Sequence, residues 1–95
     1  MKDLPVTRGR RYIMALVAEG EHDRQDFKYA VSDARKIARS ISAFANAGGG
    51  RLLIGVKDNG AIAGVRNEED AYVVELAAHR YCDPPQEVDF KAYSV

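Results

Sequence analysis

The sequence predicts an α+β fold in which helices flank a mixed β-sheet, with the elements in the order α-β-α-β-β-α-β. Three observations predict this class. Apolar residues recur at helical spacing in some segments and alternate or run together in others. A strand–helix–strand unit comes early in the chain, and such units cross over right-handed and leave their strands parallel. The turn signal Asp58-Asn59-Gly60 then predicts a hairpin, which adds an antiparallel strand to the same sheet.

The first half of the chain is predicted to form a helix, a strand and a second helix. Apolar residues at helical spacing predict a helix over 10–19, which Gly20 ends. Alternating apolar residues predict a short strand over 25–31. Ser32 or Asp33 can cap the next helix by accepting a hydrogen bond from its free amide groups. The buried stripe of this helix consists of Ile37, Ile41, Phe44 and Ala45, and its polar face carries Arg35, Arg39, Ser42 and Asn46.

The second half is predicted to supply three strands and one helix. The run "LLIGV" is apolar on both alternating faces, so residues 51–56 form a strand that is covered from both sides. After the turn, residues 61–65 return as its antiparallel partner. Asn67 opens a helix with acidic residues in its first turn. Its apolar positions include Val73, Leu76, Ala77 and Tyr81, and Pro84-Pro85 ends it. Residues 87–95 alternate like a last strand.

Length and composition limit the class of protein. Ninety-five residues make a single domain over residues 1–95, and an apolar fraction of 46% is too high for a disordered chain. No apolar run is long enough to span a membrane, and the polar start is not a secretory signal. The one cysteine suits a reducing compartment, so we expect a cytoplasmic location. The last predicted strand is a poor place for a domain to finish. We therefore expect either that the chain is the N-terminal fragment of a longer protein or that a partner completes its last strand.

The net charge of zero hides an asymmetry along the chain. Residues 1–66 hold twelve Lys/Arg against seven Asp/Glu, a balance of +5, and residues 67–95 hold two against seven, a balance of −5. A basic segment attracts phosphate backbones, so this distribution favours contact with nucleic acid. The alternative is an unevenly charged solvated surface, since no Lys/Arg block exceeds two residues.

The three glycines 48–50 do not form a phosphate-binding loop. A P-loop follows a strand, precedes a helix and ends in Lys-Ser/Thr, so that amides and the helix dipole converge on phosphate. Here a helix comes first and a strand follows, and Arg51 stands directly after the glycines. The glycines are therefore interpreted as the end of the helix and a tight turn. There is no P-loop for ATP.

Several motifs occur in a fixed order over Leu16 to Val65: "EGE", "DFK", "ISAFANAGGGRLLIGV" and "KDNGAIAGV". This order resembles the Schlafen Alba-like domain family, whose hallmarks are Glu-Phe-Lys, Ala-Phe-Ala-Asn with a glycine pair, and a Leu-Leu-Ile-Gly-Val strand before an Asp-Gly-type hairpin. The resemblance implies a Schlafen Alba-like fold and a nucleic-acid-binding domain of a prokaryotic transcriptional-regulator-like protein, with DNA or RNA as partner. Ala47 departs from the family, where Thr or Ser often follows Ala-Phe-Ala-Asn.

The resemblance also implies an alternative function. Animal relatives cleave structured RNA with three acidic residues, and the matching positions here are Glu21, Asp26 and Asp58. Clustered carboxylates can hold Mg²⁺ or Mn²⁺, which activates water against a phosphodiester, so the alternative is a divalent-metal-dependent RNA endonuclease. Asp26 replaces the family's Glu and is shorter by one methylene. In the other interpretation the three residues have no catalytic role. Glu21 is exposed in a charged turn, Asp26 pairs with a nearby arginine or lysine, and Asp58 bonds the backbone of the hairpin turn.

The first hypothesis remains binding of the phosphate backbone by basic residues. The predicted contacts are Lys28, Arg35, Lys36, Arg39, Arg51 and Lys57. Tyr29 could stack on a base, although a buried tyrosine is more common. A third hypothesis is a non-catalytic oligomerisation or interaction domain that forms homo-oligomers, suggested by the opposite charges of the two segments and the unfinished last strand. His22 and His79 show no zinc-ligand spacing, and Cys82 lacks the partners of a nucleophile.

Overall fold

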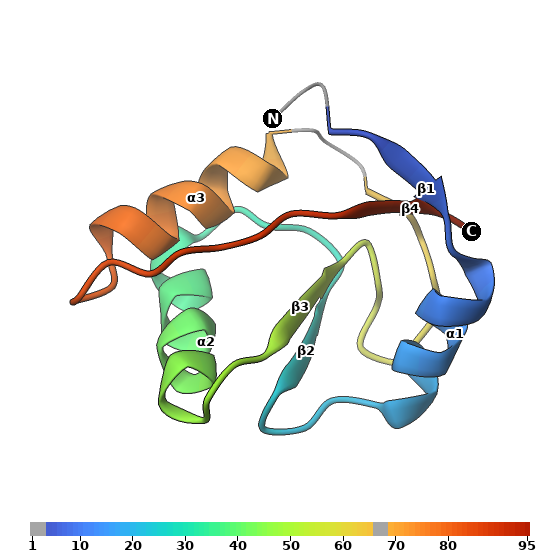
Figure 1. Cartoon of the computed structure of the whole chain (residues 1–95), viewed down its shortest axis with the longest axis horizontal. Coiled ribbons are helices and arrows are strands. Elements are labelled where there is room, and N and C mark those ends of the chain that lie inside the picture. Colours follow the sequence, from blue (N-terminus) through green and yellow to red (C-terminus); the bar gives the residue numbers. More distant parts are fainter. Residues whose placement is uncertain (1–3, 66–68) are drawn as a thin grey trace.

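The computed structural model describes residues 4–65 and 69–95. Within them the elements are, in chain order, β1 (Val6–Arg8), α1 (Arg10–Glu19), β2 (Gln25–Lys28), α2 (Ala34–Asn46), β3 (Arg51–Ile54), α3 (Asp70–Arg80) and β4 (Ala92–Ser94) (Figure 1). The predicted α+β class is confirmed, and α1, β2, α2, β3, α3 and β4 follow one another in the predicted order. The strands form two small sheets, β1 with β4 and β2 with β3.

The β2–β3 pair is parallel, as the strand–helix–strand pattern predicts. Its register joins Gln25 to Arg51 and Lys28 to Ile54. The ladder is shorter than the apolar run because Gly55 adopts φ 91°, in the left-handed region that side chains other than glycine avoid. Its amide still donates to the Lys28 carbonyl at 2.7 Å, but its own carbonyl accepts from the amides that follow the hairpin turn.

The antiparallel strand predicted over 61–65 is reduced to an isolated bridge between Val56 and Ile62. The tight turn explains this: the Lys57 amide donates to the Ala61 carbonyl at 2.9 Å, and beyond Ile62 the chain turns away at Gly64, where φ is 85°. The full ladder was therefore a wrong expectation, although the hairpin position was correct. The N-cap predicted at residue 67 lies outside the described residues.

The β1–β4 pair was not predicted from the sequence. Val6 pairs with Ala92 and Arg8 with Ser94 in a parallel ladder that brings the two ends of the described chain side by side (Figure 1). Strand β1 has three residues, all exposed, so no apolar alternation marks it. The last strand, predicted over 87–95, contracts to the three residues that find this partner.

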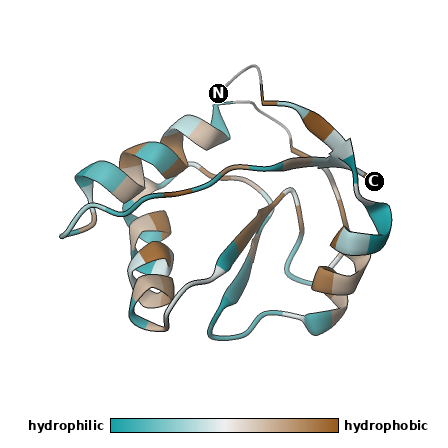
Figure 2. Ribbon diagram, viewed as in Figure 1, coloured by the Kyte–Doolittle hydropathy of each residue, from teal (hydrophilic) through white to brown (hydrophobic). Residues whose placement is uncertain are grey.

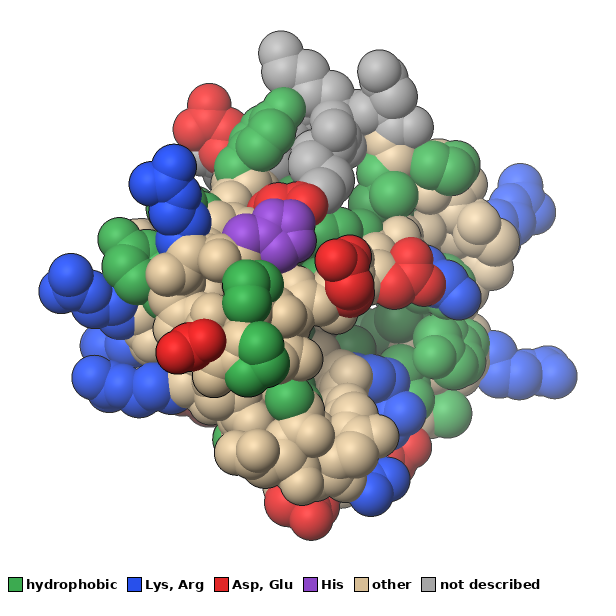
Figure 3. All heavy atoms as spheres, turned by 60° about the vertical axis from the view of Figure 1, so that its left-hand side comes forward, with side chains coloured by type: hydrophobic (Ala, Val, Ile, Leu, Met, Phe, Trp, Pro, Cys, Tyr) green, Lys and Arg blue, Asp and Glu red, His purple; other side chains and the backbone are tan. Residues whose placement is uncertain are grey.

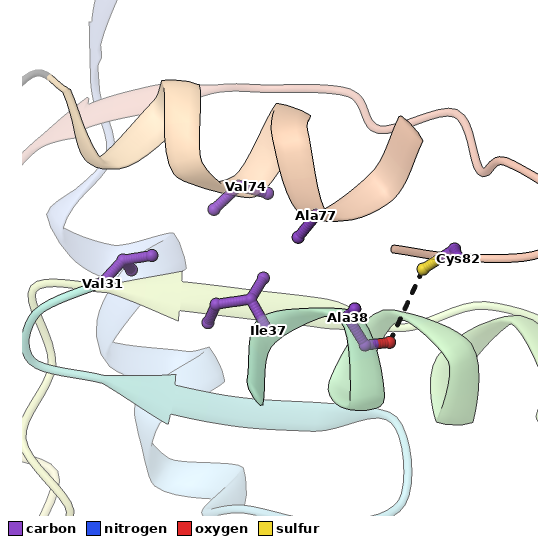
Figure 4. Packing of buried hydrophobic residues seen from close by; sticks show 6 residues of the cluster. All are labelled: Val31, Ile37, Ala38, Val74, Ala77 and Cys82. Carbon is purple, nitrogen blue, oxygen red and sulfur yellow. Dashed lines mark hydrogen bonds between the residues drawn. The ribbon is translucent and has the colours of Figure 1, made fainter. Parts of the chain in front are cut away.

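The core lies between α2 and α3 and under the β2–β3 pair. Of the two predicted caps, Ser32 and Asp33, it is Asp33 that begins α2: its Oδ1 accepts from the amides of Arg35 at 3.0 Å and Lys36 at 3.4 Å. Hydrophobic and hydrophilic residues then alternate around α2 (Figure 2). The buried cluster consists of Val31, Ile37, Ala38, Val74, Ala77 and Cys82 (Figure 4). The side chains that α3 buries here include Ala77 and Ala78, and α2 buries Ile37 and Ala38. The opposite face of α2 stays in solvent.

Candidate nucleic-acid interface

The exposed face of α2 carries three basic residues: Arg35, Lys36 and Arg39. Within the described part of the chain, none of the three forms an ion pair with a carboxylate. Arg35 and Arg39 are one helical turn apart on this face. Ser42 and Asn46 lie in line with them toward the end of the helix, so the four residues form one polar stripe. This face therefore presents positive charge that no side chain of the described residues neutralises.

The stripe opens onto a groove of about 630 Å³. The groove is lined by Arg35, Ala38, Arg39, Ser42, Ala43, Asn46 and Tyr81. All but the last come from α2. Tyr81 directly follows α3 and is 46% exposed, and the guanidinium carbon of Arg35 lies 5.5 Å from the centre of its ring. At this distance the cation and the ring attract one another.

Cys82 fixes the position of Tyr81 against α2. It is only 5% exposed, and its thiol donates to the Ala38 carbonyl across 3.6 Å (Figure 4). The Ser42 hydroxyl lies 3.6 Å from the same sulfur and donates to it. The cysteine thus joins the segment that follows α3 to the middle of α2.

Two other predicted basic residues lie at the carboxyl end of the β2–β3 pair. The Lys57 ammonium stands 5.4 Å from the centre of the Tyr29 ring, and this tyrosine is 40% exposed. Lys28 Nζ lies 3.2 Å from Asp26 Oδ2, so its charge is partly neutralised. The predicted interpretation of Asp26 as an ion-pair partner is therefore correct.

Arg51 lies at the opposite end of the strands and is held by structural contacts. Its Nε donates to Gln25 Oε1 at 3.0 Å, and its Nη2 donates to Glu19 Oε1 at 3.0 Å. The predicted basic residues are thus distributed over three places instead of one patch. On the face shown in Figure 3, Lys and Arg side chains likewise form separate groups with acidic side chains between them.

Two of the three predicted carboxylates come together. Glu21 lies close enough to Asp26 to act on its pKa, and Glu21 Oε1 accepts from the Phe27 amide at 3.0 Å. Partial burial raises the pKa of Asp26, but hydrogen bonds with Glu21, Lys28 and Ser40 and the charge of Lys28 outweigh it. The net effect is a pKa below the ordinary value of 3.8.

The third carboxylate does not join this pair. Asp58 is exposed in the hairpin turn, and the described residues hold no group of three His, Cys, Asp or Glu side chains that could bind a metal ion. Asp26 is also already engaged by Lys28 and by the Ser40 hydroxyl at 3.2 Å. As they lie here, Glu21, Asp26 and Asp58 do not fit a Mg²⁺ or Mn²⁺ site. Their catalytic role stays a prediction.

The family model described as Schlafen, AlbA_2 matches residues 21–95. The chain belongs to the Schlafen AlbA_2 family. The resemblance expected from residues 16–65 is thus confirmed, and the match extends through α3 and β4. No curated protein and no solved structure matches the chain significantly. Membership of this family points to a nucleic-acid-related domain.

The sequence of this Schlafen AlbA_2 domain did not reveal that Tyr81 lines the groove. Tyr81 was assigned to the apolar positions of the last helix, because its spacing from Ala77 is helical. The helix ends one residue earlier, and its neighbour Cys82 takes the buried position. The Pro84-Pro85 pair only requires the helix to end by about residue 83, so it gave no signal that the helix ends before Tyr81. In the described residues no helix has the length and apolar character needed to cross a membrane.

Proposed function

We propose that this Schlafen AlbA_2 domain binds nucleic acid by phosphate contacts along the exposed face of α2. The observation that carries the proposal is the set of cations on that face, Arg35, Lys36 and Arg39, which lack carboxylate partners among the described residues. A phosphate that meets these groups does not compete with an internal ion pair. Counterions released from the nucleic acid then supply most of the binding free energy.

The geometry of the helix suits an extended phosphate backbone. The stripe from Arg35 to Asn46 covers about 16 Å of helix axis, since an α-helix rises about 1.5 Å per residue. Arginine can grip two phosphate oxygens at once through its planar guanidinium group. Lys28 and Arg51 are assigned at most a secondary part, because Lys28 faces the Asp26 carboxylate and Arg51 is held by Gln25 and Glu19. Lys57 is also secondary, because it follows β3 and does not lie on the α2 face.

The experiment measures fluorescence anisotropy of labelled DNA and RNA oligonucleotides with the full chain, across about 50 to 200 mM salt. We expect affinity to fall as salt rises. The double variant Arg35→Ala/Arg39→Ala should reduce the slope of log K against log salt by roughly 1.4 on a single strand, at about 0.7 per lost contact. The control Arg8→Ala/Arg11→Ala removes the same charge from exposed positions on β1 and α1.

Two results would overturn the proposal. The first is no binding at the lowest salt. The second is an equal loss in the control and in the α2 double variant, because binding would then depend on total charge and not on this face.

The finer functions implied by the resemblance stay predictions. These are a role in a prokaryotic transcriptional-regulator-like protein, metal-dependent RNA cleavage and assembly into homo-oligomers. The pairing of Glu21 with Asp26 is the one observation that bears on cleavage, and the separate position of Asp58 leaves that pair without a third carboxylate among the described residues.

A further inference from the structure

We infer that the groove between α2 and Tyr81 takes single-stranded nucleic acid, with an unpaired base stacked against Tyr81 and the adjoining phosphates on Arg35 and Arg39. This inference rests on the proposed function and adds the form of the ligand. Three features support it: the exposure of Tyr81, the chemistry of the groove and the size of the groove.

Tyr81 is not required by the hydrophobic core. It is 46% exposed, while the adjacent Cys82, at 5%, fills the buried position between α3 and α2. A large aromatic ring beside a groove, held in place by its neighbour in the chain, is the arrangement that base stacking needs. The ring loses little conformational freedom on binding, because the backbone that carries it is already packed.

The cations are placed next to the ring. Arg35 lies over the Tyr81 ring at 5.5 Å, and Arg39 lines the same groove one turn further along α2. A base that stacks on the tyrosine therefore has its own phosphates beside two guanidinium groups. In single-stranded complexes, aromatic rings and a basic track occur together in this way.

The rest of the groove is polar enough to meet the edge of a base. Asn46 offers an amide donor and acceptor at one end of the lining. Near the middle, the Ser42 hydroxyl donates to Cys82 and keeps its oxygen as an acceptor. The groove is shallow and open to solvent, with a volume of about 630 Å³, so a base can lie in it without being enclosed. The opening can thus accept an unpaired nucleotide.

A duplex cannot use these features in the same way. Its bases are stacked on one another and present only their edges in the grooves, so an aromatic ring at the protein surface finds no open base face. The phosphates of a duplex can still reach Arg35 and Arg39. Removing the ring should therefore weaken single-strand binding selectively.

The test compares a labelled oligothymidylate of about twelve nucleotides with a duplex of the same length, both titrated with the full chain at low salt. Tyr81→Ala should weaken single-strand binding roughly tenfold, since stacking on one base is worth about 1–3 kcal/mol. Duplex binding should change by less than about twofold, and the salt slope should stay unchanged because no phosphate contact is lost. Tyr81→Phe should bind like the original chain, because stacking does not need the hydroxyl group.

The matched control is Tyr72→Ala, which removes a tyrosine of similar exposure, 47%, from α3 at a position that does not line the groove. It should leave both affinities unchanged. Far-UV circular dichroism of each variant verifies that the fold survives, as expected from the exposure of both rings.

The possible failures are distinguishable. If Arg35→Ala/Arg39→Ala weakens single-strand binding but Tyr81→Ala does not, this inference is wrong and the proposed function stands. If neither variant weakens binding, both are wrong. If polyglutamate displaces the oligonucleotide equally well from the original chain and from Tyr81→Ala, the groove binds anions in general, as an acidic protein partner would require, and the inference is again overturned.

Discussion

Gln25 is the largest fully buried side chain among the described residues, at 0% exposure, and its replacement gives the sharpest test of how the fold is held together. Its amide nitrogen donates to the carbonyls of Leu16 at 2.6 Å and Gly20 at 2.8 Å, where α1 ends. Its Oε1 accepts from Arg51 Nε at 3.0 Å, at the start of β3. One side chain on β2 therefore connects a helix end with a neighbouring strand.

The substitution Gln25→Leu keeps the volume close to that of glutamine and removes all three hydrogen bonds. Each is worth about 1 kcal/mol net, and the buried Leu16 carbonyl left without this donor adds a desolvation cost of about 1–3 kcal/mol. Burying leucine in place of the amide offsets about 1 kcal/mol of this loss. We therefore expect the free energy of unfolding to fall by about 3–5 kcal/mol, a large part of the roughly 5–15 kcal/mol typical of a domain.

The assay is urea unfolding followed by far-UV circular dichroism, because the chain has no tryptophan. Gln86→Leu is the control: its Nε2 makes one exposed bond, to the Pro84 carbonyl at 3.0 Å, so it should cost less than about 0.5 kcal/mol. Gln25→Glu should lower the free energy of unfolding more at neutral pH than at acidic pH, because an ionised carboxylate would face the carbonyl oxygens of Leu16 and Gly20. A Gln25→Leu variant within about 0.5 kcal/mol of the original chain would refute the reasoning.

Three further outcomes are expected. Gly55→Ala should destabilise the domain by several kcal/mol in urea unfolding, because φ is 91° and the new Cβ would lie 2.6 Å from the Gly64 carbonyl carbon; a loss under about 1 kcal/mol would contradict this. Because folding lowers the pKa of Asp26, the stability that its carboxylate contributes is present above about pH 4 and is lost as the pH falls further. Asp26→Asn should therefore flatten the pH dependence of the free energy of unfolding below that point; an unchanged pH dependence there would show that the carboxylate contributes nothing. Since Asp58 lies apart from the pair of Glu21 and Asp26, we expect structured RNA to remain intact in Mn²⁺ as in EDTA; cleavage that needs Mn²⁺ and disappears in Asp58→Ala would establish the endonuclease instead.

Helical spacing predicts which residues share the polar face of α2, but it does not predict which basic residues of other elements lie near that face. The polar face of α2 follows from helical spacing alone, which correctly places Arg35, Arg39, Ser42 and Asn46 together. Arg51 looks the same as these arginines in the sequence. Only the fold turns it toward Glu19 and Gln25, because those partners come from other elements.

The sequence by itself determined the α+β class, the order of α1, β2, α2, β3, α3 and β4, a cap of α2 at Ser32 or Asp33 and the parallel β2–β3 pair. These features depend on interactions within one turn or one strand–helix–strand unit, so local patterns suffice to predict them. The tertiary structure alone decided the β1–β4 pairing, the contact of Arg35 with Tyr81 and the burial of Gln25. Each of these depends on which distant segment finally packs against the residue, and no local periodicity encodes that choice.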